Sequence, residues 1–169
     1  MITSRNDLKT PRRPRWAPVV NTLEIAINGA AKIDRKDVDE LLSAVQEAFK
    51  SLREGVATQR QWSILAGCMD VAKAIERQGV VRGLHEHLDS ADTALQAIYK
   101  RARKVDGWKP TALHFYELDA VRDFVNLYAF QIRKLSRAEF DQVVKTATSQ
   151  IRSNGGQVAV IRMVSGVAA

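Results

Sequence analysis

The stretch VRGLHEHLDSADTALQAIYKRARKV, residues 81–105, has the most regular apolar pattern in the 169-residue chain. Its apolar residues are separated alternately by three and four positions, and they are Val81, Leu84, Leu88, Ala91, Leu95, Ile98, Ala102 and Val105. This spacing aligns them along one side of an α-helix, as in the seam of a coiled coil. We therefore predict a helix over residues 80–105, whose seam packs against neighbouring helices or against a second copy of the chain.

Apolar residues at helical spacing predict further helices on both sides of this segment. They cover residues 34–54, 58–78, 110–134 and 136–153. Asp34 suits the N-cap of the first, because its carboxylate can accept a hydrogen bond from a free backbone N–H. Thr58 with Gln61, and Ser136 with Glu139, have the spacing of capping boxes at the start of two others. Helix 58–78 has apolar residues on nearly every side, so we expect it to be central and buried.

The linkers between these helices are short, which makes consecutive helices antiparallel neighbours. We predict an all-α fold, an up-and-down bundle of five to six helices in a domain spanning residues 19–153. Residues 19–31 fit either a short helix or a strand, and we favour the helix. An extended basic tail precedes the domain at residues 1–18, where three prolines disfavour helix. Residues 154–169 are predicted to be a C-terminal strand or tail. If they form a strand, it covers residues 157–164.

The composition fits one globular domain. The chain is 46% hydrophobic with a net charge of +7, which is too apolar and too weakly charged for a wholly disordered protein. Its single cysteine, Cys68, cannot form an intramolecular disulfide. No apolar run reaches the ~20 residues of a membrane helix, and the N-terminus lacks the apolar stretch of a secretory signal. We therefore expect a cytoplasmic protein without a membrane partner.

The three histidines do not form a complete metal site. His85 and His87 are two residues apart, so on a helix they point about 200° away from each other and cannot share an ion. His114 and Glu117 have the spacing of carboxylate-bundle metal sites, but such sites need further matching His and Glu residues on facing helices. We predict no metal, no cofactor and no catalytic residues. An enzymatic alternative requires groups such as Glu117, Asp119 or His114 to converge on a pocket.

The positive charge is concentrated in three parts of the chain. Residues 1–18, 99–110 and 133–169 each carry a net charge of +4, whereas residues 19–98 carry −3. In the middle part the heptad pattern turns the cations outward, where a partner could reach them, although a helix dipole also favours cations in its last turns. Trp108 either covers the end of the bundle or is an exposed anchor. The candidate contacts for an acidic partner or a nucleic acid are Arg12, Arg13, Arg15, Trp16, Lys100, Arg103, Lys104, Trp108 and Lys109.

Several stretches of the chain have a recognisable pattern. They are PRRPRW in the tail, GVATQRQWSILAGCMDVAKAI, ADTALQAIYKRA, and the run from ELDAVRDFVNLYAFQI into LSRAEFDQV. These stretches resemble short helical proteins of bacterial prophages and plasmids that have no known activity. The resemblance implies a mobile-element origin. Its motifs are packing patterns, so it implies no catalytic residues.

Three hypotheses about function follow. The first is a non-enzymatic interaction or accessory protein that binds a macromolecular partner and could form a homodimer through residues 81–105 or 157–164. The second is a nucleic-acid-binding protein that uses the basic tail and residues 100–109, with an affinity that falls steeply with salt. The third is a small helical enzyme. The regular apolar pattern without a polar constellation favours the first.

Overall fold

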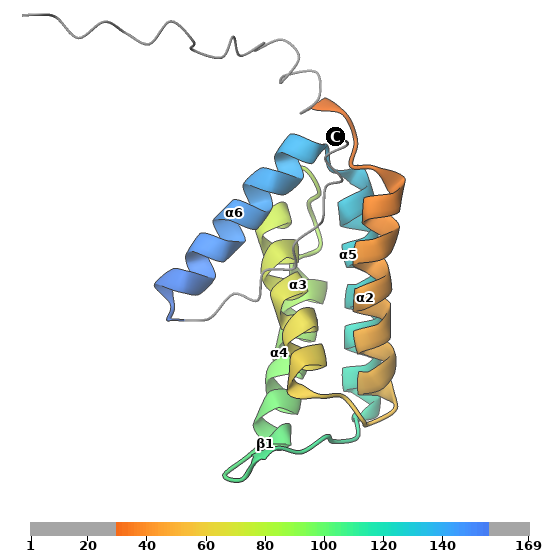
Figure 1. Ribbon diagram of the computed structural model, residues 1–169, viewed down its shortest axis with the longest axis vertical. Coiled ribbons are helices and arrows are strands. Elements are labelled where there is room, and N and C mark those ends of the chain that lie inside the picture. The colour runs from red at the N-terminus through yellow and green to blue at the C-terminus, as the bar shows by residue number, and fades with distance from the viewer. Residues whose placement is uncertain (1–29, 156–169) are drawn as a thin grey trace, which may run out of the picture.

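The computed structural model describes residues 30–155, which form five helices and one small hairpin (Figure 1). The helices are α2 (Arg35–Arg53), α3 (Gln59–Gln78), α4 (His85–Ala102), α5 (Phe115–Lys134) and α6 (Arg137–Ser153), and the strands are β1 (Arg103–Lys104) and β2 (Gly107–Trp108). The predicted helical class is confirmed for these residues, apart from the hairpin, and the up-and-down order of the bundle stays a prediction. The predictions for residues 1–18, 19–29 and 157–164 lie outside the described residues.

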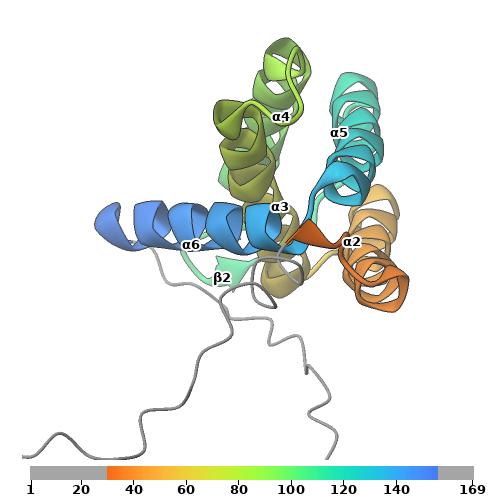
Figure 2. The same cartoon turned by 90° about the horizontal axis from the view of Figure 1, so that it is seen from above.

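Helix α3 lies at the centre of the arrangement. Helices α2 to α5 run along the long axis of the molecule, whereas α6 is inclined to them and packs against α3 (Figures 1 and 2). Helix α3 contacts α2, α4, α5 and α6, which confirms the prediction that it is central. Its buried side chains include Leu65, Cys68, Met69, Ala72 and Ile75.

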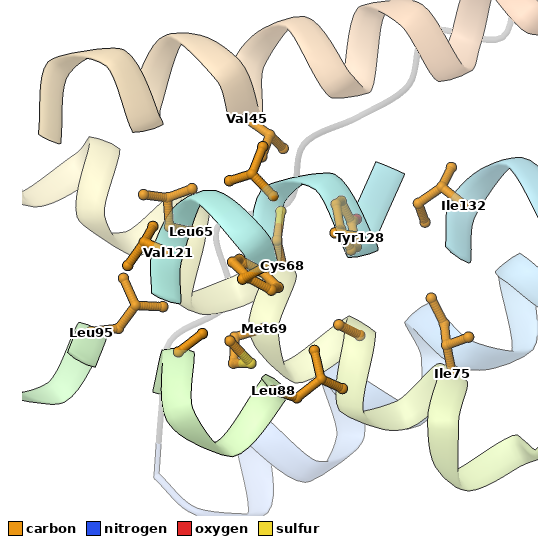
Figure 3. Packing of buried hydrophobic residues seen from close by; sticks show 14 of the residues in the cluster. Val45, Leu65, Cys68, Met69, Ile75, Leu88, Leu95, Val121, Tyr128 and Ile132 are labelled. Carbon is orange, nitrogen blue, oxygen red and sulfur yellow. The ribbon is translucent and has the colours of Figure 1, made fainter. Parts of the chain in front are cut away.

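The core is formed where side chains from several helices meet around α3. Val45 of α2, Leu88 of α4 and Tyr128 of α5 converge on the face of α3 that carries Cys68 and Met69 (Figure 3). Burial of the Cys68 thiol raises its pKa to about 11, although a hydrogen bond with Tyr128 opposes the effect. The thiol is therefore protonated at neutral pH, and Cys68 serves as a small apolar core residue.

The predicted N-terminal caps of three helices are present. Asp34 Oδ1 accepts a hydrogen bond of 2.9 Å from a backbone N–H in the first turn of α2. In α3, Gln61 N donates to Thr58 Oγ1 at 3.3 Å, and Thr58 N donates to Gln61 Oε1 at 2.9 Å. Ser136 and Glu139 form the same reciprocal pair at the start of α6. These caps confirm the starts of three helices as read from residue spacing alone.

The helix predicted over residues 80–105 is shorter than its apolar pattern indicates. It begins at His85, because the preceding Gly83 has a φ of +86°, a left-handed conformation that an α-helix does not contain. It ends at Ala102, where the chain turns into the hairpin. Val105, which the heptad pattern places in the seam, is fully exposed at the hairpin tip. The pattern is therefore correct within α4 and wrong beyond its end.

The apolar seam of α4 is buried within the chain. Leu88, Leu95 and Ile98 are at most 1% exposed, and α4 packs against α3 and α5. These neighbours occupy the face that a homodimer through residues 81–105 would need.

The helix predicted over residues 110–134 also begins later, at Phe115. The residues before it form a loop across the end of the molecule, and the physical reason is a buried ion pair described below. None of the helices within residues 30–155 is long and apolar enough to span a membrane.

Replacing Leu65 by alanine should destabilise the fold strongly, because this side chain is fully buried in α3. We expect the free energy of unfolding to fall by about 2–5 kcal/mol in denaturant titrations. The control is Val105→Ala, which should change it by less than ~0.5 kcal/mol, since Val105 is exposed. If Val105→Ala lowers the free energy of unfolding as much as Leu65→Ala does, Val105 is part of the core and the hairpin is wrong.

Candidate binding surface at the hairpin end

One end of the molecule is built from segments that follow one another in the chain. They are the last turn of α4, the β1–β2 hairpin, the loop of residues 109–114 and the first turn of α5, and we name them together the hairpin end (Figure 1). The structure brings together here the predicted contacts Lys100, Arg103, Lys104, Trp108 and Lys109. The other predicted contacts lie outside the described residues, and they are Arg12, Arg13, Arg15 and Trp16.

The hairpin redirects the chain after α4. Its register pairs Arg103 with Trp108 and Lys104 with Gly107. Gly107 has a φ of +114°, a conformation that residues with a side chain rarely adopt. Arg103 and Lys104 therefore extend from a strand, and their predicted position on the outer face of a helix is wrong.

Trp108 holds the hairpin against the helices. Its Nε1 donates a hydrogen bond of 2.8 Å to the carbonyl of Ala57, and its ring lies 6.1 Å from Trp62 and 6.0 Å from Tyr99, between centroids. The Nε1 of Trp62 donates in turn to the carbonyl of Leu95 at 2.9 Å. Both indole N–H groups are satisfied, so the half-buried Trp108 covers the end of the helices, one of the two roles that its sequence position allowed.

A buried ion pair joins the end of α4 to the start of α5. The guanidinium of Arg101 donates to both carboxylate oxygens of Glu117 at 2.5 Å, and Glu117 is fully buried. The same guanidinium donates to the carbonyl of Ala112 at 3.4 Å. Glu117 Oε2 also accepts a hydrogen bond of 2.8 Å from the backbone N–H of His114. One carboxylate therefore caps α5, which explains why the helix begins at Phe115, and also anchors the loop before it.

The ion pair keeps both of its members charged. Burial alone would raise the pKa of Glu117, but the hydrogen bonds from Arg101 and the His114 amide, together with the Arg101 charge, hold that pKa below its ordinary value. The hydrogen bond to Glu117 is the main cause that raises the pKa of Arg101. Because breaking such a pair leaves an uncompensated charge, the contact is costly to disrupt.

Four cations of the hairpin end face the solvent, and they are Lys100, Arg103, Lys104 and Lys109. Within residues 30–155 none of them forms an ion pair. Arg103 lies over the ring of Tyr99, with its Cζ 5.6 Å from the centroid, and donates to the Tyr99 hydroxyl. The positive charge of this end is therefore open to an external partner.

The same end exposes large apolar side chains. Within residues 30–155 six such residues are exposed, and four of them lie at this end: Val105, Phe115, Tyr116, and Val56 in the adjoining loop after α2. Phe115 is 81% exposed and Tyr116 is 65% exposed. The ring of His114 stacks on Tyr116 with centroids 5.6 Å apart and planes 4° from parallel. Exposed apolar residues gathered beside free charge are typical of a contact surface.

Sequence analysis missed Phe115 and Tyr116 as candidate contacts. The signal was present in His114 and Glu117, whose separation of three residues matches the separation in the two capping boxes that were recognised. The same separation also fits a carboxylate-bundle metal site, an alternative that the sequence analysis sets aside because matching residues are lacking. As a cap it starts the helix at Phe115 and places both aromatic rings in the first turn.

The histidines occupy separate positions on the molecule. His85 Nε2 lies 3.0 Å from Asp89 Oδ2, one helical turn along α4, and His87 is exposed on the same helix. His114 is the N-cap of α5. Across the described residues 30–155, no group of three or more His, Cys, Asp or Glu side chains could hold a metal ion.

Two open clefts lie away from the hairpin end. The larger, of about 720 Å³, is formed by α3, α4 and α6 and includes Lys73, whose Nζ is 2.6 Å from Asp92 Oδ2. The smaller, of about 350 Å³, lies between the start of α2 and the end of α5. The residues that the enzymatic hypothesis requires to converge, Glu117, Asp119 and His114, line neither of them.

No protein family, curated protein or solved structure that was compared with the chain matches it. The resemblance to prophage and plasmid proteins therefore stays a prediction.

Replacing Glu117 by glutamine should destabilise the protein at neutral pH and less so in acid. At pH 7 the Arg101 charge loses its partner, and we expect the free energy of unfolding to fall by about 2–3 kcal/mol, a value reduced because Arg101 is 30% exposed. The lowered pKa of Glu117 means that its contribution is present above its ordinary pKa and is lost as the pH falls through the lowered value. The gap between wild type and variant should therefore narrow toward acid pH in denaturant titrations.

The matched control for this variant is Glu139→Gln. Glu139 holds the same position in the capping box of α6, where the hydrogen bond from Ser136 N lowers its pKa, but within residues 30–155 it forms no ion pair with an arginine. We expect a loss of about 1 kcal/mol or less. Equal losses in the two variants would show that Arg101 adds nothing to the cap.

Proposed function

We propose that this chain is a non-enzymatic, cytoplasmic helical-bundle protein of mobile-element origin that binds an acidic macromolecular partner at its hairpin end. The observation that carries the proposal is that four solvent-facing cations, which form no ion pair within residues 30–155, and exposed apolar side chains lie at the same end of the molecule. Lys104 and Val105 stand together on the hairpin, and Lys109 leads into the loop before Phe115.

The stability of α4 does not account for these cations. A helix dipole favours positive charge in its last turn, which is a sufficient structural reason for Lys100. Helix α4 ends at Ala102, so Arg103, Lys104 and Lys109 lie beyond that turn. The dipole effect falls off within the last turn of a helix. The helix dipole therefore does not explain Arg103, Lys104 and Lys109, and contact with a partner remains as a reason for them.

The exposed apolar side chains support the same conclusion. Leaving Val105 and Phe115 in water forgoes the hydrophobic free energy that their burial would provide. A partner that covers them recovers this free energy, while the cations of the hairpin end steer acidic partners toward it. Apolar residues at the centre with charge at the rim are typical of macromolecular interfaces.

A nucleic acid is the second candidate partner, bound by residues 100–109 together with the tail of residues 1–18. The observation that favours it is the presence of solvent-facing cations at the same end as the stacked rings of His114 and Tyr116. If the four hairpin-end cations each contact one phosphate of a single strand, log affinity should fall with log salt at a slope of about −3.

Reversing two charges of the hairpin should weaken polyanion binding. We expect Lys104→Glu with Lys109→Glu to lower the affinity for a labelled poly-glutamate peptide or oligothymidylate by about tenfold or more at low salt, roughly 1.4 kcal/mol. Both lysines are exposed, so the fold should be retained. The measurement is a fluorescence anisotropy titration of the full chain.

The matched control is Lys36→Glu with Lys145→Glu. It changes the net charge of the chain by the same amount as the hairpin-end variant, but at positions on α2 and α6. Both of these lysines are also exposed. The control should retain most of the affinity, because it lies away from the hairpin end. Equal losses in the two double variants would mean that only net charge matters, and would contradict the proposed surface.

A further inference from the structure

We propose that the partner held at the hairpin end is a single-stranded nucleic acid, with unpaired bases on the first turn of α5 and phosphates on the cations of α4 and the hairpin. This inference rests on the proposed function and narrows the partner to one chemical class. The contacts are Phe115 and Tyr116 for the bases, and Lys100, Lys104 and Lys109 for the phosphates.

The ion pair between Arg101 and Glu117 brings the first turn of α5 close to the last turn of α4, so the exposed rings and the exposed lysines belong to the same end of the molecule. Glu117 directly follows Phe115 and Tyr116 in the chain, and Arg101 directly follows Lys100. The two hydrogen bonds of 2.5 Å between Arg101 and Glu117 therefore hold the last turn of α4 beside the first turn of α5. A single strand offers a base and a phosphate at every nucleotide, and this end offers both kinds of contact within one rigid unit.

The rings at the start of α5 are suited to stacking. Phe115 and Tyr116 are both mostly exposed, so a planar group can reach them. Tyr116 already stacks in parallel with His114, the arrangement that an unpaired base adopts on an aromatic side chain. Stacking of this kind tolerates any base, because every base has a π-face.

Other acidic partners use only part of this surface. Bases inside a duplex are stacked on one another and present only their edges in the grooves, so the rings would have no flat face to meet. An acidic peptide would pair with Lys104 and Lys109 and can cover the rings only through separate apolar side chains, whereas each nucleotide carries both a phosphate and a planar base. A single strand matches both the charge and the rings.

The test compares three labelled probes in anisotropy titrations of the full chain at low salt. They are an oligothymidylate of about 20 nucleotides, a duplex of the same length and a poly-glutamate peptide. We expect the oligothymidylate to bind most tightly. Phe115→Ala with Tyr116→Ala should weaken its binding about tenfold or more, because stacked bases lose their platform. The slope of log affinity against log salt should stay unchanged in this variant, since its phosphate contacts remain.

Two variants serve as controls. Tyr116→Phe keeps the ring and should retain the affinity. Phe130→Ala removes an exposed ring near the other end of α5 and should change the affinity by about twofold or less. Since Phe115 and Tyr116 are exposed, the double alanine variant should unfold at the same temperature as the wild type, which separates lost stacking from lost structure.

The outcomes distinguish this inference from the proposed function. If Lys104→Glu with Lys109→Glu weakens poly-glutamate binding while the double alanine variant binds oligothymidylate normally, the inference is overturned and an acidic protein partner remains. Duplex binding as tight as single-strand binding also overturns the inference. Failure of all three probes to bind at low salt overturns both.

Discussion

The hairpin end depends on one charged contact, the pair between Arg101 and Glu117. The Glu117 carboxylate is completely buried, which costs free energy unless the charge is paired and hydrogen-bonded. Hydrogen bonds from the Arg101 guanidinium and the His114 amide offset that cost. That set of bonds decides where α5 begins, how the preceding loop crosses the molecule, and which face of the first turn meets water. The proposed binding surface is thus a consequence of how one buried charge is satisfied.

Most of the helical framework can be predicted from the sequence, because helix caps and apolar spacing are local signals. Thr58 with Gln61, and Ser136 with Glu139, form capping boxes at the predicted places. The surplus of apolar residues around α3 predicts its central position, since a helix that is apolar on most sides must be surrounded.

The hairpin and the exposed rings have weaker local signals, which are Asp106-Gly107 after Val105 and the capping-box spacing of His114 and Glu117. Heptad spacing continues through Val105, three residues past the end of α4, and the Asp106-Gly107 turn comes only after it. The helix stops where Trp108 can reach the carbonyl of Ala57, 51 residues earlier in the chain. The cations were found from composition alone, whereas the aromatic half of the surface required knowing where Glu117 caps α5.

The hairpin end is one continuous segment of the chain, from the last turn of α4 to the first turn of α5. Two side chains fix it to the helices, the indole of Trp108 and the carboxylate of Glu117. Residues 109–116, between these two side chains, contribute little to the apolar core. They can therefore change in length and character while the helices keep their packing, as surface loops on a rigid scaffold generally can. The packed helices must be preserved for folding, whereas the segment between Trp108 and Glu117 can diverge. Related chains could therefore exchange this segment and acquire new partners.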